Sequence, residues 1–147
     1  MCRGYRRSPS RQFSVLFLLL GLVLGGRAVS AVPVDLPESV PIIDAERLIE
    51  LAQTYADLLL IDSRIRSDRL QGYIEGAVSL PDTKTTCRSL AEVTTSRDQP
   101  LIFYCNGTDC DRSGKAVTIA HHCRFKNIYW FRGGFKEWKA KRYPYIK

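Results

Sequence analysis

The architecture of this chain is indicated most clearly by residues 101–113, which read Leu101-Ile102-Phe103-Tyr104-Cys105-Asn106-Gly107-Thr108-Asp109-Cys110-Asp111-Arg112-Ser113. Its first four residues are apolar or aromatic, which predicts a strand buried on both faces. Cys105 follows directly and a helix-like pattern begins after the polar loop, so the cysteine is expected at the carboxyl end of a parallel strand. There the loop N–H groups and the positive end of the next helix favour a thiolate over a neutral thiol.

Cys105 is therefore a candidate nucleophile. Gly107 lets the loop curl without a Cβ clash, and Arg112 and Lys115 add fixed positive charge. The alternative interpretation is a buried cysteine at a strand end that packs as a small hydrophobic side chain. The nucleophilic role is favoured over the packing role, because a glycine, an arginine and the start of a helix follow Cys105 within a few residues.

Strands and helices alternate on both sides of this loop. Before it, the pattern predicts helices at 45–53, capped by Asp44, and 88–93, a helical turn at 68–71, and strands at 58–61 and 77–80. After it, the pattern predicts an amphipathic helix through Ala116, Ile119, Ala120 and Cys123, a strand at 127–131 and a helix at 135–141. This alternation indicates an α/β fold with a largely parallel central sheet flanked by helices.

Residues 1–31 have the pattern of an export signal. Arg3, Arg6, Arg7 and Arg11 precede an apolar run at 13–24, and small residues at 28–31 offer a cleavage site. The apolar run is shorter than the about 20 residues that span a bilayer, so no stable membrane span is expected after signal removal. Residues 32–41 contain three prolines and are expected as an extended lead-in to a single domain at 42–147.

The signal accounts for most of the excess positive charge. Five of the 22 basic residues and none of the 15 acidic residues lie in 1–31, which leaves 17 against 15. This small surplus gives nucleic-acid binding no support. Residues 112–147 still hold ten basic residues and one acidic residue, Glu137. That half of the domain either steers small anions toward Cys105 or is a solvated basic surface.

Four cysteines remain beyond the signal, Cys87, Cys105, Cys110 and Cys123. An even number in an exported chain suggests disulfides, but the spacing does not determine their pairing. Cys87 either pairs with Cys123 or stays free. No Cys-x-x-Cys pair with matching histidines occurs, so no metal is expected, and no organic cofactor is indicated. His121 and His122 fall within a predicted helix, where a satisfied or exposed histidine fits better than a general base.

Four blocks in order resemble the rhodanese-like family over about residues 42–146. Residues 60–64 are similar to its apolar strand that ends in Asp-x-Arg, and residues 72–81 to its Gly-His-Ile-x-Gly-Ala block, with Tyr73 in place of the histidine. Residues 103–105 match the strand that carries the family's catalytic cysteine. Residues 129–138, followed by Tyr143 and Pro144, resemble its C-terminal signature.

The resemblance implies a sulfurtransferase. Cys105 would take a sulfane sulfur from a thiosulfate- or persulfide-type donor, become a persulfide, and pass the sulfur to a thiol or another nucleophilic acceptor. Residues 106–113 would form the loop that cradles the anionic persulfide, with Arg112 closing it. Asp62 and Arg64 are expected to tie strand and loop together through hydrogen bonds.

The loop departs from the family pattern. With residues 106–111 between Cys105 and Arg112 it is longer than usual, and it resembles the Cys-Asn-Gly-x-x-Cys-x-Arg-Ser loop of an exported subgroup. Asp109 and Asp111 would oppose anion binding unless they point outward. Cys110 admits three interpretations: it resolves a persulfide or sulfenate on Cys105 by forming a disulfide, it only lines the pocket, or it is itself the main nucleophile.

Three functions remain open at this stage. The first is a periplasmic or secreted sulfurtransferase that acts on a small sulfur-containing anion or thiol, with a periplasmic partner protein as a further expectation. The second is a dithiol redox domain that uses Cys105 and Cys110. The third is a non-catalytic rhodanese-like binding module, because one fold can host many functions. The joint presence of Cys105, Gly107 and Arg112 argues against the third.

Overall fold

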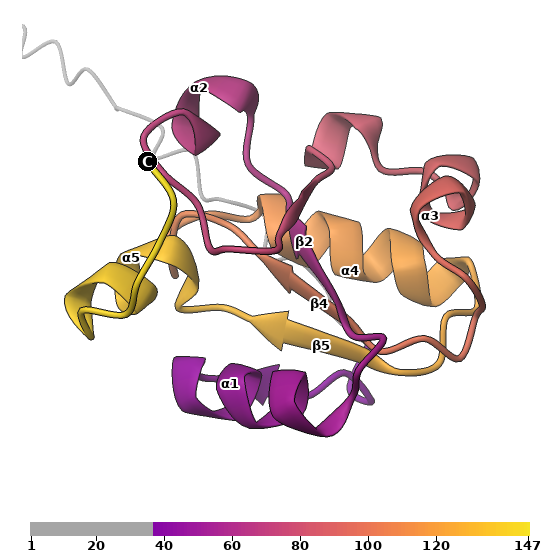
Figure 1. Ribbon diagram of the computed structural model, residues 1–147. Coiled ribbons are helices and arrows are strands. Elements are labelled where there is room, and N and C mark those ends of the chain that lie inside the picture. The colour runs from indigo at the N-terminus through magenta and orange to yellow at the C-terminus, as the bar shows by residue number, and fades with distance from the viewer. Residues whose placement is uncertain (1–36) are drawn as a thin grey trace, which may run out of the picture. The chain divides into compact units, whose positions relative to one another are not determined.

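The computed structural model describes residues 37–147 (Figure 1). The predicted export signal at 1–31 and residues 32–36 of the predicted lead-in lie outside this part of the chain. Within the lead-in, the Val40 N–H donates to the Pro37 carbonyl at 3.0 Å. This part therefore turns instead of running extended. In residues 37–147, no helix is both long and apolar enough to cross a membrane.

Five parallel strands form one sheet in the order β1-β5-β4-β2-β3. They are β1 (Ile42–Ile43), β2 (Leu59–Asp62), β3 (Val78–Ser79), β4 (Leu101–Tyr104) and β5 (Ile128–Phe131). β4 is the central strand, and all of its residues are buried, because helices cover both faces of a parallel sheet. The predicted α/β fold with a parallel sheet flanked by helices is confirmed.

The helices of the described part are α1 (Ala45–Thr54), α2 (Arg66–Arg69), the 3-10 helix η1 (Asp82–Lys84), α3 (Cys87–Val93), α4 (Arg112–His122) and α5 (Gly134–Ala140). Asp44 caps α1, as predicted, because its side chain accepts the Arg47 N–H at 2.8 Å. Thr86 caps α3 through reciprocal hydrogen bonds with Ser89. These caps satisfy N–H groups that the first turn of a helix leaves without partners.

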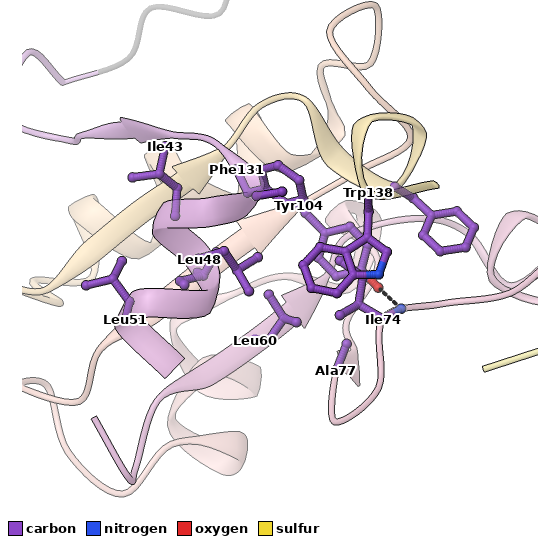
Figure 2. Packing of buried hydrophobic residues seen from close by; sticks show 12 residues of the cluster. Ile43, Leu48, Leu51, Leu60, Ile74, Ala77, Tyr104, Phe131 and Trp138 are labelled. Carbon is purple, nitrogen blue, oxygen red and sulfur yellow. Dashed lines mark hydrogen bonds between the residues drawn. The ribbon is translucent and has the colours of Figure 1, made fainter. Parts of the chain in front are cut away.

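Two hydrophobic clusters hold the helices against opposite faces of the sheet. In Figure 1, α1 and α4 lie on different sides of the strands. One cluster joins α1 and α5 to the sheet and includes Leu48, Tyr104 and Trp138 (Figure 2). The other joins α3 and α4 to it and includes Phe103 and Val117. Side chains of successive strand residues point to opposite faces, which is why Phe103 and Tyr104 belong to different clusters.

Two short elements do not follow from the sequence pattern. β1 has only two residues, and they pair with Trp130 and Phe131 of β5. η1 is a single turn after Pro81. Each is too short for a hydrophobic period to develop, so contacts with distant parts of the chain determine it.

Cys123 lies in the core, as its helical spacing predicts, but it is not a free thiol there. It forms a disulfide with Cys87, and the two Cα atoms are 5.4 Å apart. The bond joins the first residue of α3 to the residue that ends α4. Of the two alternatives for Cys87, pairing with Cys123 is therefore correct.

Candidate active site

The centre of the candidate site is the end of β4. Cys105 follows Tyr104 directly and is 1% exposed. Its carbonyl accepts the Phe135 N–H at 2.9 Å, and the carbonyl of Tyr104 accepts the Ser63 N–H at 3.0 Å. The segment that follows β2 and the start of α5 thus fix the backbone around Cys105. This is the carboxyl edge of the sheet, where parallel α/β proteins build their sites.

Cys105 and Cys110 form a disulfide, with their Cα atoms 6.2 Å apart. The Cys110 N–H donates to the Gly107 carbonyl at 3.0 Å, and this turn brings the second cysteine back to the first. Cys110 is half-buried, whereas Cys105 is almost completely shielded from solvent. Among the three interpretations of Cys110, the resolving role requires this juxtaposition.

Arg112, the first residue of α4, is held by Asp68 of α2. Its Nη1 donates to Asp68 Oδ2 at 2.7 Å, and the side-chain amide of Asn106 donates to the same oxygen at 2.8 Å. The hydrogen bond from Asn106, followed by the hydrogen bond and charge of Arg112, keeps the pKa of Asp68 below its ordinary value. Asp68 therefore fastens both ends of the loop to α2.

The start of α5 supports the loop from another side. The N–H groups of Phe135 and Lys136 donate to the carbonyls of Cys105 and Asn106 at 2.9 and 2.8 Å. Gly134 makes this approach possible, because its φ is +57° and a Cβ there would collide with the carbonyl oxygen of Cys105. The sequence indicates Gly134 only as part of a turn, so its support of the loop is an addition from the structure.

The missing Cβ of Gly107 matters in the structure, as expected, and the element that it accommodates is α5. The φ of Gly107 lies outside the left-handed region, so the curl of the loop does not depend on a positive φ. The residue is buried, and a Cβ on it would lie 3.3 Å from the Cβ of Lys136. The missing side chain makes room for α5.

A cavity of about 650 Å³ opens over the loop and the start of α5. Its walls are basic at Arg112, Lys115, Lys136 and Lys139, acidic at Asp109 and Asp111, and are completed by Asn106, Gly107, Cys110 and Phe135. Cys110 belongs to the walls, and Cys105 does not. The two aspartates thus border the cavity instead of pointing away from it, but the cationic side chains outnumber them.

Two loop residues lie apart from this cavity. Thr108 is exposed, and Ser113 is buried, where its hydroxyl accepts the indole N–H of Trp130 at 2.9 Å. Ser113 therefore fixes α4 to β5. Lys136 and Lys139 also belong to the site, although no sequence motif marks them individually and only the basic excess of residues 112–147 indicates them as a group.

A buried ion pair lies at the end of β2. Nε and Nη2 of Arg64 donate to the two carboxylate oxygens of Asp62 at 2.8 and 2.7 Å. The Tyr104 hydroxyl also donates to Asp62, at 2.9 Å. Burial, reinforced by the negative charge of Asp62, raises the pKa of Tyr104, so this hydroxyl remains a donor. Arg64 further donates to the Gly72 carbonyl at 2.9 Å, and the group ties β2 to the segment that follows it.

The two histidines lie in α4 and are exposed. Within residues 37–147, no three His, Cys, Asp or Glu side chains come together as ligands of a metal ion would. The reactive groups that the structure does bring together at the site are the two cysteines, with charged side chains around them.

The sequence of this chain matches a known protein family. The model of the rhodanese-like domain family matches residues 44–141. An uncharacterized protein of Escherichia coli K12, YibN, is 24% identical over 92 residues, which are 62% of this chain and 62% of that protein. The match thus spans less than two thirds of the length of this curated relative.

Two solved structures have the same fold. The rhodanese-like domain of the Anabaena protein Alr3790 superposes with a TM-score of 0.61 at 24% identity, covering 71% of this chain and 77% of that chain. The polysulfide-sulfur transferase of Wolinella succinogenes superposes with a TM-score of 0.60 at 20% identity, and the match covers 73% of this chain and 78% of that chain. With a parallel sheet that ends in a cysteine loop and a family match over most of the domain, this chain belongs to the family of rhodanese-like domains.

Proposed function

We propose that this protein is an exported sulfurtransferase that moves a sulfane sulfur through a persulfide on Cys105. The observation that carries the proposal is the position of this cysteine at the end of the central strand, at the start of a loop that lines a cavity with four cationic side chains. The positive charges favour an anionic sulfur and attract anionic substrates. Membership of the rhodanese-like family supports the reaction class, and the name of the W. succinogenes protein supports the donor class.

The proposed reaction consists of two displacements at sulfur. The Cys105 thiolate attacks the sulfane sulfur of a thiosulfate- or persulfide-type donor, and the S–S bond of the donor breaks with its electron pair leaving on sulfite or on a thiolate. A thiol or another nucleophile then attacks the outer sulfur of the Cys105 persulfide, and Cys105 leaves again as a thiolate. These steps need no metal or organic cofactor.

In the structure, Cys105 and Cys110 are joined in a disulfide. A disulfide sulfur is no nucleophile, so the pair must first be reduced by a thiol. Cys110 is the accessible end for this attack, because the residue is half-buried and borders the cavity. Transfer activity should therefore depend on prior reduction.

A dithiol redox domain is the second candidate function, and the bonded state of Cys105 and Cys110 favours it. The two candidates differ in their dependence on Cys110. In a redox domain, Cys110→Ser abolishes turnover, whereas a sulfurtransferase retains most of its transfer activity.

Export belongs to the proposal as well. Residues 1–31 have the pattern of a signal, and the cysteines of residues 37–147 are all in disulfides, which persist in oxidising compartments. We infer that the mature domain acts in the periplasm or outside the cell, with a partner protein that supplies or accepts sulfur. Fractionation of cells that express the full chain tests this, since an uncleaved product in the cytoplasm would contradict it.

The central experiment measures sulfur transfer by the reduced domain. Wild type should form thiocyanate from thiosulfate, or from polysulfide, and cyanide, and Cys105→Ala should form none. Ser79→Ala is a control at an exposed serine outside the cavity, and it should act as wild type does. Transfer by Cys105→Ala at the wild-type rate would refute the proposal.

A further inference from the structure

We propose a second activity for the same loop, which rests on the proposed function: Cys110 converts the Cys105 persulfide into sulfide and the Cys105–Cys110 disulfide. The domain then acts as a dithiol-driven reductase of sulfane sulfur as well as a transferase. The Cys105–Cys110 bond of this structure is the bond that such a step would form.

The loop already has the geometry that the step requires. Cys105 and Cys110 are bonded in a loop that is fastened at both ends, with Arg112 and Asn106 on Asp68 and the Cys105 carbonyl on α5. Cys110 can thus reach the inner sulfur of a Cys105 persulfide while these contacts stay in place. No larger movement of the fold is needed.

The step balances without an external oxidant. The Cys110 thiolate attacks the inner sulfur of the persulfide, a Cys105–Cys110 bond forms, and the bond to the outer sulfur breaks with its electron pair. The outer sulfur leaves as hydrosulfide, so it is reduced while the two cysteine sulfurs are oxidised. A dithiol reductant then restores both thiols and is itself oxidised to a disulfide.

The cavity determines where this reductant enters. Cys110 is half-buried and borders the cavity, whereas Cys105 is 1% exposed and does not. A thiolate that enters from the cavity therefore meets the sulfur of Cys110, and Cys105 becomes the leaving group. Lys115, Lys136 and Lys139 stabilise the incoming thiolate. Cys105 is thereby returned as the thiolate that begins the next transfer.

The two activities make different demands on Cys110. Transfer to an external acceptor needs an attack on the outer sulfur and leaves Cys110 unused. Release of sulfide needs an attack by Cys110 on the inner sulfur. The serine variant of Cys110 therefore separates the new activity from the proposed one.

The test is a single turnover of reduced, desalted protein. Benzenethiosulfonate serves as the sulfur donor, because its leaving group is a sulfinate and it produces no sulfide of its own. Released sulfide is measured by methylene blue formation, and the peptides that contain Cys105 and Cys110 are followed by mass spectrometry. No thiol is present during the reaction.

Wild type should release about one equivalent of sulfide and form the Cys105–Cys110 disulfide. Cys110→Ser should keep an added sulfur atom on Cys105 and release no more sulfide than Cys105→Ala, which reports the background from Cys87 and Cys123. Sulfide release by Cys110→Ser at the wild-type rate, or a persulfide that persists in wild type, would overturn the inference. Addition of cyanide to loaded Cys110→Ser should give thiocyanate, and only the absence of thiocyanate there counts against the proposed transferase.

Discussion

Gly134 allows the start of α5 to lie directly against the backbone of the cysteine loop. Gly134 and Gly76 both have positive φ values, +57° and +78°, but only Gly134 is crowded, by the backbone of Cys105 and Gly107. A Cβ on Gly76 would meet no atom within 4 Å. Alanine variants of the two glycines therefore distinguish the loss of stability caused by backbone strain alone from the loss caused by strain together with a steric collision.

We expect Gly76→Ala to lose about 1–3 kcal/mol of unfolding free energy from strain alone. Gly134→Ala should lose more, and it should also slow sulfur transfer, because the loop carbonyls are pushed away from the N–H groups of α5. Urea denaturation and thiocyanate formation measure the two effects. Equal losses of stability with unchanged transfer in both variants would contradict this account.

At the residue scale, the sequence predicts what a local motif carries and misses what only the tertiary structure brings together. Cys105 and Arg112 follow from the strand, the loop and the helix start within one stretch. Asp68 lies 38 and 44 residues from its partners Asn106 and Arg112, so no local spacing marks it. The Cys87–Cys123 bond is likewise long-range, because its cysteines are 36 residues apart. The sequence offered this bond, and the Cys105–Cys110 bond within the short loop, each as one alternative among others.

At the element scale, the short helix α2 determines the position of Arg112 through Asp68. Asp68→Asn keeps the shape of the side chain and removes its charge. We expect this variant to remain folded at neutral pH but to transfer sulfur up to about 100-fold more slowly, because a misplaced loop loses its alignment with the substrate. The rate of thiocyanate formation, with circular dichroism as the check of folding, measures the effect.

The same carboxylate gives a prediction about pH. Because the folded state lowers the pKa of Asp68 from its ordinary 3.8, the carboxylate adds stability above this value. This contribution is lost as the pH falls through the lowered pKa. The stability difference between wild type and Asp68→Asn should therefore hold down to about pH 4 and vanish at lower pH. Urea denaturation across this range tests it, and a difference that disappears already near neutral pH would contradict it.

Elements with a full hydrophobic pattern could be predicted closely, whereas those without one were displaced or missed. β4 agrees with the predicted strand residue for residue, and α1 differs by one residue at its end. α2 begins two residues before the predicted helical turn, because no apolar period marks it and none of its residues is buried. β1 depends on pairing with β5, which no local pattern contains.

At the scale of the whole molecule, the two disulfides should contribute differently to stability. Cys87 and Cys123 are 36 residues apart in sequence, whereas Cys105 and Cys110 are 5 apart. Because a longer closed loop restricts the unfolded chain more, replacing Cys87 and Cys123 by serine should cost about 4 kcal/mol. Replacing Cys105 and Cys110 should cost about 2 kcal/mol.

Denaturation of the two double variants without reductant measures this difference. The Cys87/Cys123 variant should retain sulfur transfer at temperatures where it is folded, since this bond lies between α3 and α4 and outside the cavity. A larger loss of stability in the Cys105/Cys110 variant would show that the short loop, and not the long one, stabilises the domain.

The anchoring of the cysteine loop leaves its middle free to evolve. α5 holds its first residues, and Asp68 holds Asn106 and Arg112. Between these anchor points, Thr108 and Asp109 are exposed. Substitutions of these two side chains would keep the turn from Gly107 to Cys110 and both anchor points, so natural variation or a designer could recruit new substrates by exchanging solvent-facing residues while the nucleophile stays where it is.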